Sequence, residues 1–393
     1  MNRIKNILLW LFLIPLALTA QEKQVPIMAW SGIPSTEINL ERYLEMKEMG
    51  INIHLSTFQN ADAMQKGLEL SSQAGIKLIG SCPELKSDME NTVKRFKNHP
   101  ALYGWFLRDE PVRKDFAELG EWAGKIRAVD AGHTCFVNLI SSINPHKTNA
   151  LGTGSYAEYV STFAKEVPVG LLSFDFYPVL NVGLHEFWYE GLGIFSAEAQ
   201  KLDKPFWAFA LASSYNELHP VPTVAALRLQ LFSNLCYGAQ GLEFWSYWQS
   251  DGLRSAPISQ SGKRTVVYDR IKTVTHEIQA LSGVFTGSKL VSVFHTGTVI
   301  PRGTTRLSAL LSAIRVFEPE EPGVLVSTLE NGDVSYWVIL NRDLEKTQKV
   351  IVSGNASLKR VLNDGTVVNA DRYDATIEIE PGDVAIFQFP TQK

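Results

Sequence analysis

Cysteine is scarce in this chain of 393 residues, which contains only Cys82, Cys135 and Cys236. The three lie far apart in apolar surroundings, without the short paired spacing of a zinc site. An odd number without such a pattern also argues against a disulfide framework. We therefore expect three buried thiols and a fold that no disulfide framework holds together.

The chain also lacks any cluster of positive charge. Its 37 lysines and arginines are scattered singly among 41 acidic residues, and the net charge is −4. A protein that binds nucleic acid normally carries a basic stripe or patch. We therefore expect no nucleic-acid partner and favour a small neutral or weakly polar ligand.

Three familiar site motifs are missing as well. The sequence contains no histidine and cysteine cluster for zinc, no glycine-rich phosphate loop and no Gly-x-Ser-x-Gly nucleophile elbow. We expect a site that uses neither a metal nor a cofactor.

A long apolar run is present at the N-terminus. In residues 1–20, MNRIKNILLWLFLIPLALTA, Arg3 and Lys5 precede an apolar segment that is interrupted by Pro15 and ends at Ala20. This is the layout of a secretory signal peptide, and the segment is short for a membrane span. We expect a mature chain that is exported to the periplasm or the extracellular space and is not inserted in a membrane.

Shorter apolar runs recur at intervals of roughly 25 to 36 residues, each followed by a helical pattern. Their continuous apolar character suits parallel strands that are covered on both faces. Eight such units favour a (β/α)8 TIM barrel over a doubly wound sheet, which stays open as the alternative. The runs begin near Pro26, Ile51, Lys77, Leu102, Thr134, Gly170, Pro205 and Gly241.

Two of the intervening segments show clear helical signals. Asp115 and Glu118 have the spacing of a capping box. Between the seventh and eighth runs, one helical stripe is marked by Val224, Leu227, Leu231 and Leu235.

The pattern changes after about residue 290. Asn331-Gly332 and Asp364-Gly365 lie between strand-like runs as hairpin turns, and ATIEIE alternates apolar and acidic residues. These features predict a small all-β sandwich of roughly 100 residues. We divide the chain into a signal peptide (1–20), a barrel (21–288) and a C-terminal β-sandwich (289–393), with a linker at 287–292.

In a (β/α)8 barrel the active site lies at the C-terminal ends of the strands. Polar and aromatic residues at the ends of the runs are therefore the candidate site. They are Trp30, His54, Asp109, Glu110, Asn138, Asp175, Tyr177, Trp207, Glu243, Trp245 and Trp248.

This combination of carboxylates, an amide and aromatic rings suits a sugar. The negative face of a tryptophan ring attracts the C–H face of a pyranose, and Asn and Asp hold hydroxyl groups. Glycosidic cleavage needs one carboxylic acid to protonate the leaving oxygen and a second carboxylate as nucleophile or base. We predict that Glu110, at the end of the fourth run, is the proton donor, and that Asp109 orients it or binds a hydroxyl.

Three stretches carry a family resemblance: GWFLRDEP, SFDFYP and LFSNLCYGAQGLEFWSYW. The chain resembles clan A type glycoside hydrolases, and among them barrels related to the family 42 β-galactosidases, from about Ile27 to Leu281. The resemblance implies a (β/α)8 barrel, an oligo- or polysaccharide substrate and Glu110 as acid/base. In that clan this glutamate usually follows Asn, whereas here it follows Asp109.

A larger departure concerns the second carboxylate. The clan places a nucleophilic Glu at the end of strand 7, but KPFWAFALASSYNE has no acid before Glu217. Either the strand count is off, or Glu243 or Asp175 takes this role. We rank Glu243 slightly ahead because tryptophans flank it. Since strands 4 and 8 face each other, a Glu110 and Glu243 pair would be wide, nearer the roughly 6.5–9.5 Å of inverting enzymes.

Each candidate also has a purely structural explanation. Glu110 would favour a helix dipole, Asp175 would be a buried hydrogen-bond hub, and Glu243 would pair with a basic residue inside the barrel. About half of the tryptophans would then belong to the core.

The leading hypothesis is an exported glycoside hydrolase that uses two carboxyl groups. The alternative is a non-catalytic carbohydrate-binding protein on a degenerate glycosidase barrel. The missing acidic residue at the end of strand 7 supports this alternative. A third reading is a barrel lyase or isomerase that acts on a free sugar with a metal or a lysine base.

Overall fold

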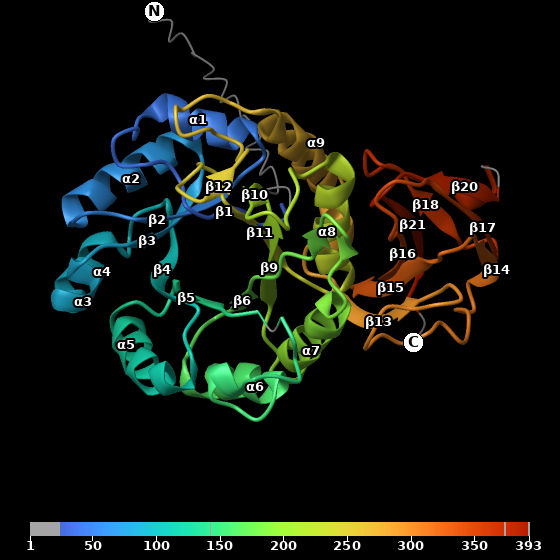
Figure 1. Ribbon diagram of the computed structural model, residues 1–393, viewed down its shortest axis with the longest axis horizontal. Coiled ribbons are helices and arrows are strands. Elements are labelled where there is room, and N and C mark those ends of the chain that lie inside the picture. Colours follow the sequence, from blue (N-terminus) through green and yellow to red (C-terminus); the bar gives the residue numbers. More distant parts are fainter. Residues whose placement is uncertain (1–23, 142, 373–374, 392–393) are drawn as a thin grey trace, which may run out of the picture.

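The eight apolar runs form eight short parallel strands that close into a barrel (Figure 1). The computed structural model describes residues 24–141, 143–372 and 375–391, so the predicted signal peptide lies outside the described residues. Neighbouring strands follow the order β1-β11-β9-β6-β5-β4-β3-β2, which confirms the predicted (β/α)8 barrel. The strands are β1 (Ile27–Ala29), β2 (Ile53–Thr57), β3 (Lys77–Ser81), β4 (Leu102–Asp109), β5 (Thr134–Leu139), β6 (Leu172–Phe174), β9 (Phe206–Leu211) and β11 (Gly241–Trp245).

Helices connect the strands and surround the barrel (Figure 1). Many begin at a residue whose side chain accepts a backbone N–H of the first turn, such as Asn39, Asn60 and Thr223. No described helix is both long and apolar enough to cross a bilayer. The helices are α1 (Leu40–Glu48), α2 (Ala61–Ala74), α3 (Glu84–Ser87), α4 (Met89–Phe96), α5 (Phe116–Val129), α6 (Tyr156–Glu166), α7 (Trp188–Lys201), α8 (Val224–Cys236), α9 (Val266–Ala280) and α10 (Ser282–Phe285).

One predicted helix, α5, begins directly after Asp115 as expected, but its predicted capping box does not form. A 3-10 turn, η1 (Arg113–Asp115), precedes α5, and the Asp115 carboxylate accepts the Val112 N–H at 2.9 Å instead of capping α5. Asp115 therefore closes the turn before the helix, and the predicted pair with Glu118 does not form. A second 3-10 turn, η2 (Asn149–Leu151), precedes α6.

Two hydrophobic layers hold the barrel. The residues between strands and helices form one large cluster, and a smaller cluster fills the barrel interior. All three cysteines are buried and unpaired, as predicted. The interior cluster consists of Met28, Ile53, Leu55, Ile79, Phe136, Leu171, Trp207 and Phe209, with Trp30, Tyr103, Phe106, Tyr177 and Trp245 packed against it.

The loops at the C-terminal ends of the barrel strands contain two pairs of short strands. The β6–α7 loop contains the antiparallel pair β7 (Val179–Leu180) and β8 (Gly183–Leu184). The loops after β9 and β11 are joined by β10 (Ser214–Tyr215) and β12 (Leu253–Arg254). The β10–β12 pair ties two separate loops together above the barrel, whereas β7 and β8 form a hairpin within one loop.

The C-terminal region is an antiparallel β-sandwich, as predicted. One sheet has the order β13-β15-β16-β21-β18-β19, and the other has the order β14-β17-β20. β13 already begins at Lys289, so the predicted linker is in part a strand. The strands are β13 (Lys289–His295), β14 (Ile314–Pro319), β15 (Val324–Asn331), β16 (Val334–Asn341), β17 (Gln348–Gly354), β18 (Lys359–Val361), β19 (Val367–Asn369), β20 (Thr376–Ile379) and β21 (Val384–Pro390), with the 3-10 turn η3 (Ala370–Arg372).

Both predicted hairpins form, with one small shift. Asn331 is the last residue of β15 and pairs with Val334, so the turn itself is Gly332-Asp333, where Gly332 has φ 64°. Gly365, with φ 82°, lies in the turn between β18 and β19. Positive φ values favour glycine at both positions.

The sandwich packs directly on the barrel. β15 and β16 contact α8 (Figure 1), and Leu325, Leu329 and Leu340 belong to the same buried cluster as the barrel helices. The Ser327 hydroxyl donates to the carbonyl of Cys236 at the end of α8, at 2.7 Å. The two domains therefore share one apolar core.

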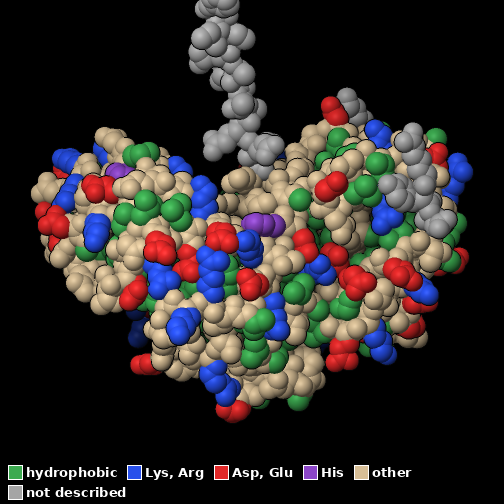
Figure 2. Space-filling view, turned by 90° about the horizontal axis from the view of Figure 1, so that it is seen from above, with side chains coloured by type: hydrophobic (Ala, Val, Ile, Leu, Met, Phe, Trp, Pro, Cys, Tyr) green, Lys and Arg blue, Asp and Glu red, His purple; other side chains and the backbone are tan. Residues whose placement is uncertain are grey.

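The outer surface has mixed charge. On the face shown in Figure 2, acidic and basic side chains are interspersed, and no contiguous basic area stands out. This distribution agrees with the scattered charges of the sequence.

Because the core is shared, we expect barrel and sandwich to unfold together. Leu340 is fully buried in the shared cluster, and Leu340→Ala should destabilise the protein by about 2–5 kcal/mol. Thermal unfolding followed by circular dichroism should show one transition at a lower temperature. The control Val367→Ala removes a side chain that is 43% exposed and should change stability by less than about 0.5 kcal/mol. Two separate transitions, only one of them shifted, would contradict a shared core.

Candidate active site

A pocket of about 240 Å³ lies where the C-terminal ends of the barrel strands meet. Three carboxyl groups, an amide and aromatic rings converge in it, and none of the described residues that line it is basic. Of the predicted site residues, the structure brings together seven. The lining residues are Trp30, Asp109, Glu110, Asn138, Asp175, Tyr177, Phe209, Tyr215 and Trp245.

A β-bulge in β4 decides which side chain enters the pocket. In the pairing with β5, Arg108 lies opposite Val137, and Leu107 is the extra residue. Asp109 therefore lies opposite Asn138, and paired residues of parallel strands share one face of the sheet. Without the bulge, Arg108 would occupy this place. Arg108 instead lies outside the pocket, 3.5 Å from the carboxylate of Asp115.

Glu110 has an unusual backbone that neighbouring groups hold in place. Its φ of 44° lies in the left-handed region, which costs an L-residue other than glycine roughly 1–2 kcal/mol. The Glu110 N–H donates to the Asn138 carbonyl at 2.9 Å, and the Tyr159 hydroxyl donates to the Pro111 carbonyl. Strain of this kind concentrates at functional sites, where the surroundings maintain it.

Glu110 and Asp175 form a close carboxyl pair. Their side chains are within hydrogen-bonding reach. Burial, followed by repulsion from the Glu110 and Asp109 carboxylates, raises the pKa of Asp175 to about 8. Burial and then the charge of Asp109 raise the pKa of Glu110, and the contact with Asp175 opposes that shift. Since two touching carboxylates repel each other strongly, the pair holds one proton near neutral pH.

A chain of hydrogen bonds runs from Asp109 into the barrel. The Asn138 amide donates to Asp109 Oδ1 at 3.1 Å, and Ser173 Oγ lies 2.9 Å from Asn138 Oδ1 and 2.8 Å from Glu243 Oε2. Asn138 Oδ1 can only accept, so the single hydroxyl hydrogen of Ser173 goes to it. Glu243 must then donate to Ser173, which requires a protonated carboxyl group. Burial raises the pKa of Glu243 well above its ordinary value, in agreement with this assignment.

The structure does not support the preference for Glu243 over Asp175. Glu243 is fully buried and does not line the pocket. Among the described residues, no Lys, Arg or His forms an ion pair with Glu243, so an ion pair inside the barrel does not explain its position. Its place in the chain of hydrogen bonds makes it a neutral group that positions Asn138 and, through it, Asp109. The wide pair predicted between Glu110 and Glu243 is replaced by the close pair of Glu110 and Asp175.

The end of the seventh barrel strand, β9, carries no carboxylate. Ala212 and Ser213 follow it, and Glu217 is the first acid after it. The Glu217 side chain is 92% exposed and pairs with Arg254 at 3.3 Å. Because the barrel has eight strands in the predicted places, the strand count was correct and the departure from the clan A pattern is real.

Three other predicted residues lie elsewhere. His54 alternates with the inward-facing Ile53 and Leu55, so its ring points to the helix layer, where Nε2 lies 2.9 Å from the Ser71 hydroxyl of α2. Trp207 is part of the barrel core, and Trp248 lines a neighbouring groove.

Aromatic side chains form one wall of the pocket. Trp245 stacks on Tyr177 with ring centroids 5.3 Å apart and an interplanar angle of 22°. Tyr215 meets Trp245 edge-on at 5.1 Å. The Trp30 ring is held between Phe106 and Phe209 in edge-on contacts at 5.2 and 5.5 Å. These contacts fix flat apolar surfaces beside the carboxyl groups.

Sequence reasoning missed three contributors: Ser173, Phe209 and Tyr215. Ser173 had a signal, because it is a polar residue two positions before Asp175 in an apolar strand. Phe209 and Tyr215 had no such signal, because the sequence around Phe209 indicates a buried strand and the sequence around Tyr215 indicates a loop. Within the described part of the chain, no group of three or more His, Cys, Asp and Glu side chains is arranged to hold a metal ion.

No family model and no curated protein sequence matches the chain. Solved structures do resemble it. A family 39 glycoside hydrolase from Bacteroides cellulosilyticus WH2 aligns with a TM-score of 0.54 at 9% identity, over 94% of this chain and 81% of that one. β-Galactosidases from Halorubrum lacusprofundi (TM-score 0.49, 12% identity, 69% of this chain and 59% of that one) and Marinomonas ef1 (0.47, 11%, 66% and 60%) also align. The first likeness shows that the chain shares the fold of that glycoside hydrolase.

The raised pKa of Asp175 predicts a pH-dependent stability. An unfolded aspartate has a pKa of about 3.9, so between about pH 4 and pH 8 the folded protein keeps a proton that the unfolded chain has released. Stability therefore falls as the pH rises through this range. Asp175→Asn removes the titrating group. We expect its stability relative to the parent protein to be higher at pH 8 than at pH 5, by on the order of 1 kcal/mol or more.

Urea unfolding at both pH values measures this difference. Asp62→Asn is a matched control, because the Asp62 side chain is 88% exposed. Its effect should be small and similar at the two pH values. An equal effect of Asp175→Asn at pH 5 and pH 8 would show that Asp175 is ionised in the folded protein throughout.

Proposed function

We propose that this protein is a glycoside hydrolase that cleaves O-glycosidic bonds. The observation that carries the proposal is the proton-sharing pair of Glu110 and Asp175 in a pocket walled by tryptophan and tyrosine rings, at the catalytic end of a (β/α)8 barrel. A carboxyl pair that keeps one proton near neutral pH supplies the acid that a departing alcohol requires.

In the proposed reaction, Glu110 donates the shared proton to the leaving oxygen. This transfer leaves both Glu110 and Asp175 ionised, and the pair regains its proton from the water molecule whose addition to the sugar completes the hydrolysis. The pair therefore acts as one acid.

Asp109 is then the second carboxylate. Burial raises the pKa of Asp109, and the hydrogen bond from the Asn138 amide opposes that shift by stabilising the ionised form. The chain through Ser173 to Glu243 fixes the amide. An ionised Asp109 stabilises the positive charge that develops on the sugar ring, as nucleophile or through a water molecule.

The finer identity of the substrate is part of the proposal. A β-galactoside is suggested by the resemblance of GWFLRDEP, SFDFYP and the segment before β11 to family 42 barrels. Export to the periplasm or the extracellular space is suggested by the pattern of residues 1–20.

One observation favours a second function, a carbohydrate receptor without catalysis. β9 ends without the carboxylate that clan A enzymes carry there, and the described residues up to Glu217 contain no substitute on this loop. A receptor would bind sugar equally well before and after Glu110→Gln and would hydrolyse none.

Leaving-group dependence tests the enzyme and separates the two roles. Glu110→Gln removes the acid and should lower kcat/KM about 10²–10⁴-fold on an alkyl β-galactoside. On the 2,4-dinitrophenyl β-galactoside, whose leaving group needs no proton, the loss should be much smaller. Asp109→Asn should lose activity on both substrates alike.

Glu243→Gln should keep activity within about tenfold, because a glutamine amide can still donate to Ser173. Glu217→Gln, at an exposed site, is the surface control, and circular dichroism verifies each fold. Complete inactivity of the parent protein on aryl galactosides, glucosides and mannosides, together with sugar binding, would favour the receptor.

A further inference from the structure

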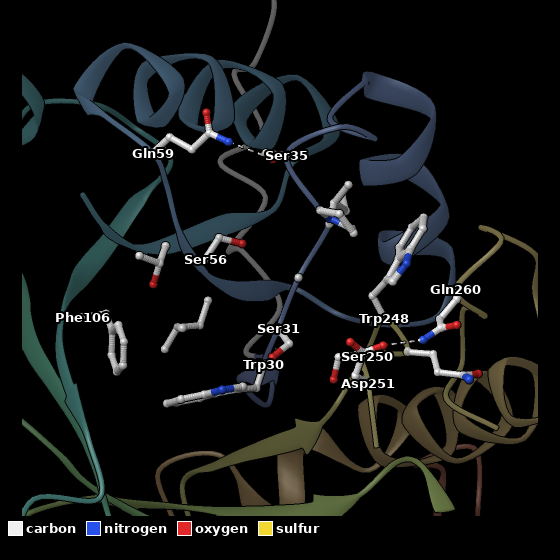
Figure 3. Close-up of a pocket in the computed structure, with 16 residues that line it drawn as sticks. Trp30, Ser31, Ser35, Ser56, Gln59, Phe106, Trp248, Ser250, Asp251 and Gln260 are labelled. Carbon is white, nitrogen blue, oxygen red and sulfur yellow. Dashed lines mark hydrogen bonds between the residues drawn. The ribbon is translucent and has the colours of Figure 1, made fainter. Parts of the chain in front are cut away.

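A second and larger cavity adjoins the carboxyl pocket. It has a volume of about 610 Å³, more than twice that of the carboxyl pocket. Its walls come from the loop after β1, the end of β2, Phe106 of β4 and the segment after β11 that contains Trp248 (Figure 3). Trp30 lines both cavities. We call the larger cavity the Trp248 groove.

The lining of the Trp248 groove is neutral and rich in hydroxyl and amide groups. Asp251 is the one charged residue among the described residues that line it, and its carboxylate accepts a hydrogen bond from Gln260 at 3.0 Å. The described lining residues include no lysine or arginine that could attract an anion. The polar lining residues are Ser31, Ser35, Ser56, Thr57, Gln59, Gln249, Ser250, Asp251 and Gln260.

Aromatic rings give the groove flat apolar surfaces. Trp30 and Phe106 lie at one end and Trp248 at the other (Figure 3). The Arg42 guanidinium lies over the Trp248 ring at 5.1 Å from its centroid, so this ring is held in place and the Arg42 charge is engaged outside the lining. Rigid aromatic rings between hydroxyl and amide groups suit the alternating apolar and hydroxyl faces of a sugar.

The groove is preformed by a tight loop. Ser31 has φ 51°, in the left-handed region, and the following Gly32 lies so close to β2 that an added Cβ would be 2.7 Å from Ser56 Oγ. At one edge of the groove, Gln59 donates to the Ser35 hydroxyl at 3.3 Å (Figure 3). Such contacts hold the polar groups in position without a ligand.

We propose that the Trp248 groove binds a further neutral sugar unit of the same substrate, which makes that substrate an oligosaccharide and not a simple monoglycoside. This inference rests on the proposed function for the position of the cleaved bond. Trp30, shared by the two cavities, is the platform over which the chain passes from the carboxyl pocket into the groove. The absence of basic residues from the described lining selects against uronate and sulfated sugars.

Affinity as a function of chain length tests the groove without relying on hydrolysis. The probes are β-1,4-linked galacto-, gluco- and manno-oligosaccharides of one to four units, titrated calorimetrically into the full chain with Glu110→Gln. We expect at least one neutral series to bind about tenfold or more tightly once a second or third unit is added. Trigalacturonate should show no such gain over galacturonate.

Two variants fill the groove from the edge at which Ser35 and Gln59 lie. Ser35→Trp and Gln59→Trp replace exposed lining residues, and each should reduce the gain with chain length to less than about threefold. Thr36→Trp is the matched control, because Thr36 is exposed on the same loop but does not line the groove, and it should retain the gain. Circular dichroism identifies a variant that fails to fold, in which case the other one decides.

The outcomes separate the two proposals. No gain with length in any neutral series, a gain that survives both filling variants, or an equal gain for trigalacturonate would overturn the inference. Hydrolysis of aryl monoglycosides without a length effect would leave the proposed function standing and remove only the groove. A length effect that the filling variants abolish, in a protein that hydrolyses nothing, would refute the proposed function and keep the sugar site.

Discussion

The site depends on how the fold keeps several carboxyl groups together without a positive charge. Asp109, Glu110 and Asp175 meet in one small pocket, Glu243 lies close to them, and no described basic residue lines that pocket. Four ionised carboxylates in such a place would repel one another and would be poorly solvated. The structure avoids this with protons and amides. The raised pKa values indicate that Glu110 and Asp175 hold one proton between them and that Glu243 is protonated, and the Asn138 amide donates a hydrogen bond to Asp109.

This solution determines the chemistry. In the proposed reaction, the proton that the pair holds is transferred to the leaving oxygen, and the neighbouring Asp109 is the base or nucleophile. The same groups reduce stability as the pH rises, because the folded state must keep protons that the unfolded chain releases. Function and instability therefore have the same physical origin, which is the desolvation of Asp175 and Glu243.

The rest of the fold holds these groups in place. The β4 bulge turns Asp109 inward, and the bond from the Glu110 N–H to the Asn138 carbonyl holds a strained backbone. Behind them, the helix layer and the sandwich share one core, so the scaffold of the site is continuous with the C-terminal domain. Leucines of β15 and β16 cover the outer face of α8 and exclude solvent from it. The sandwich therefore supports the barrel. The loops above the barrel contribute lining residues to the carboxyl pocket and to the Trp248 groove.

The sequence by itself determined the eight barrel strands, the sandwich and the position of Glu110 at the end of β4. Continuous apolar runs and turn residues are local signals, so they can be recognised without knowledge of the tertiary structure. Only the tertiary structure decided which carboxyl groups meet. Glu243 and Asp175 look alike in sequence, since both lie among aromatic residues, but the barrel buries one below the pocket and opens the other into it. His54 faces the helices because inward and outward positions alternate along β2. Asp109 replaces Arg108 in the pocket because one extra residue in β4 shifts that alternation. Which face of the sheet a side chain occupies depends on how two strands pair, and the sequence of one strand alone does not specify that pairing.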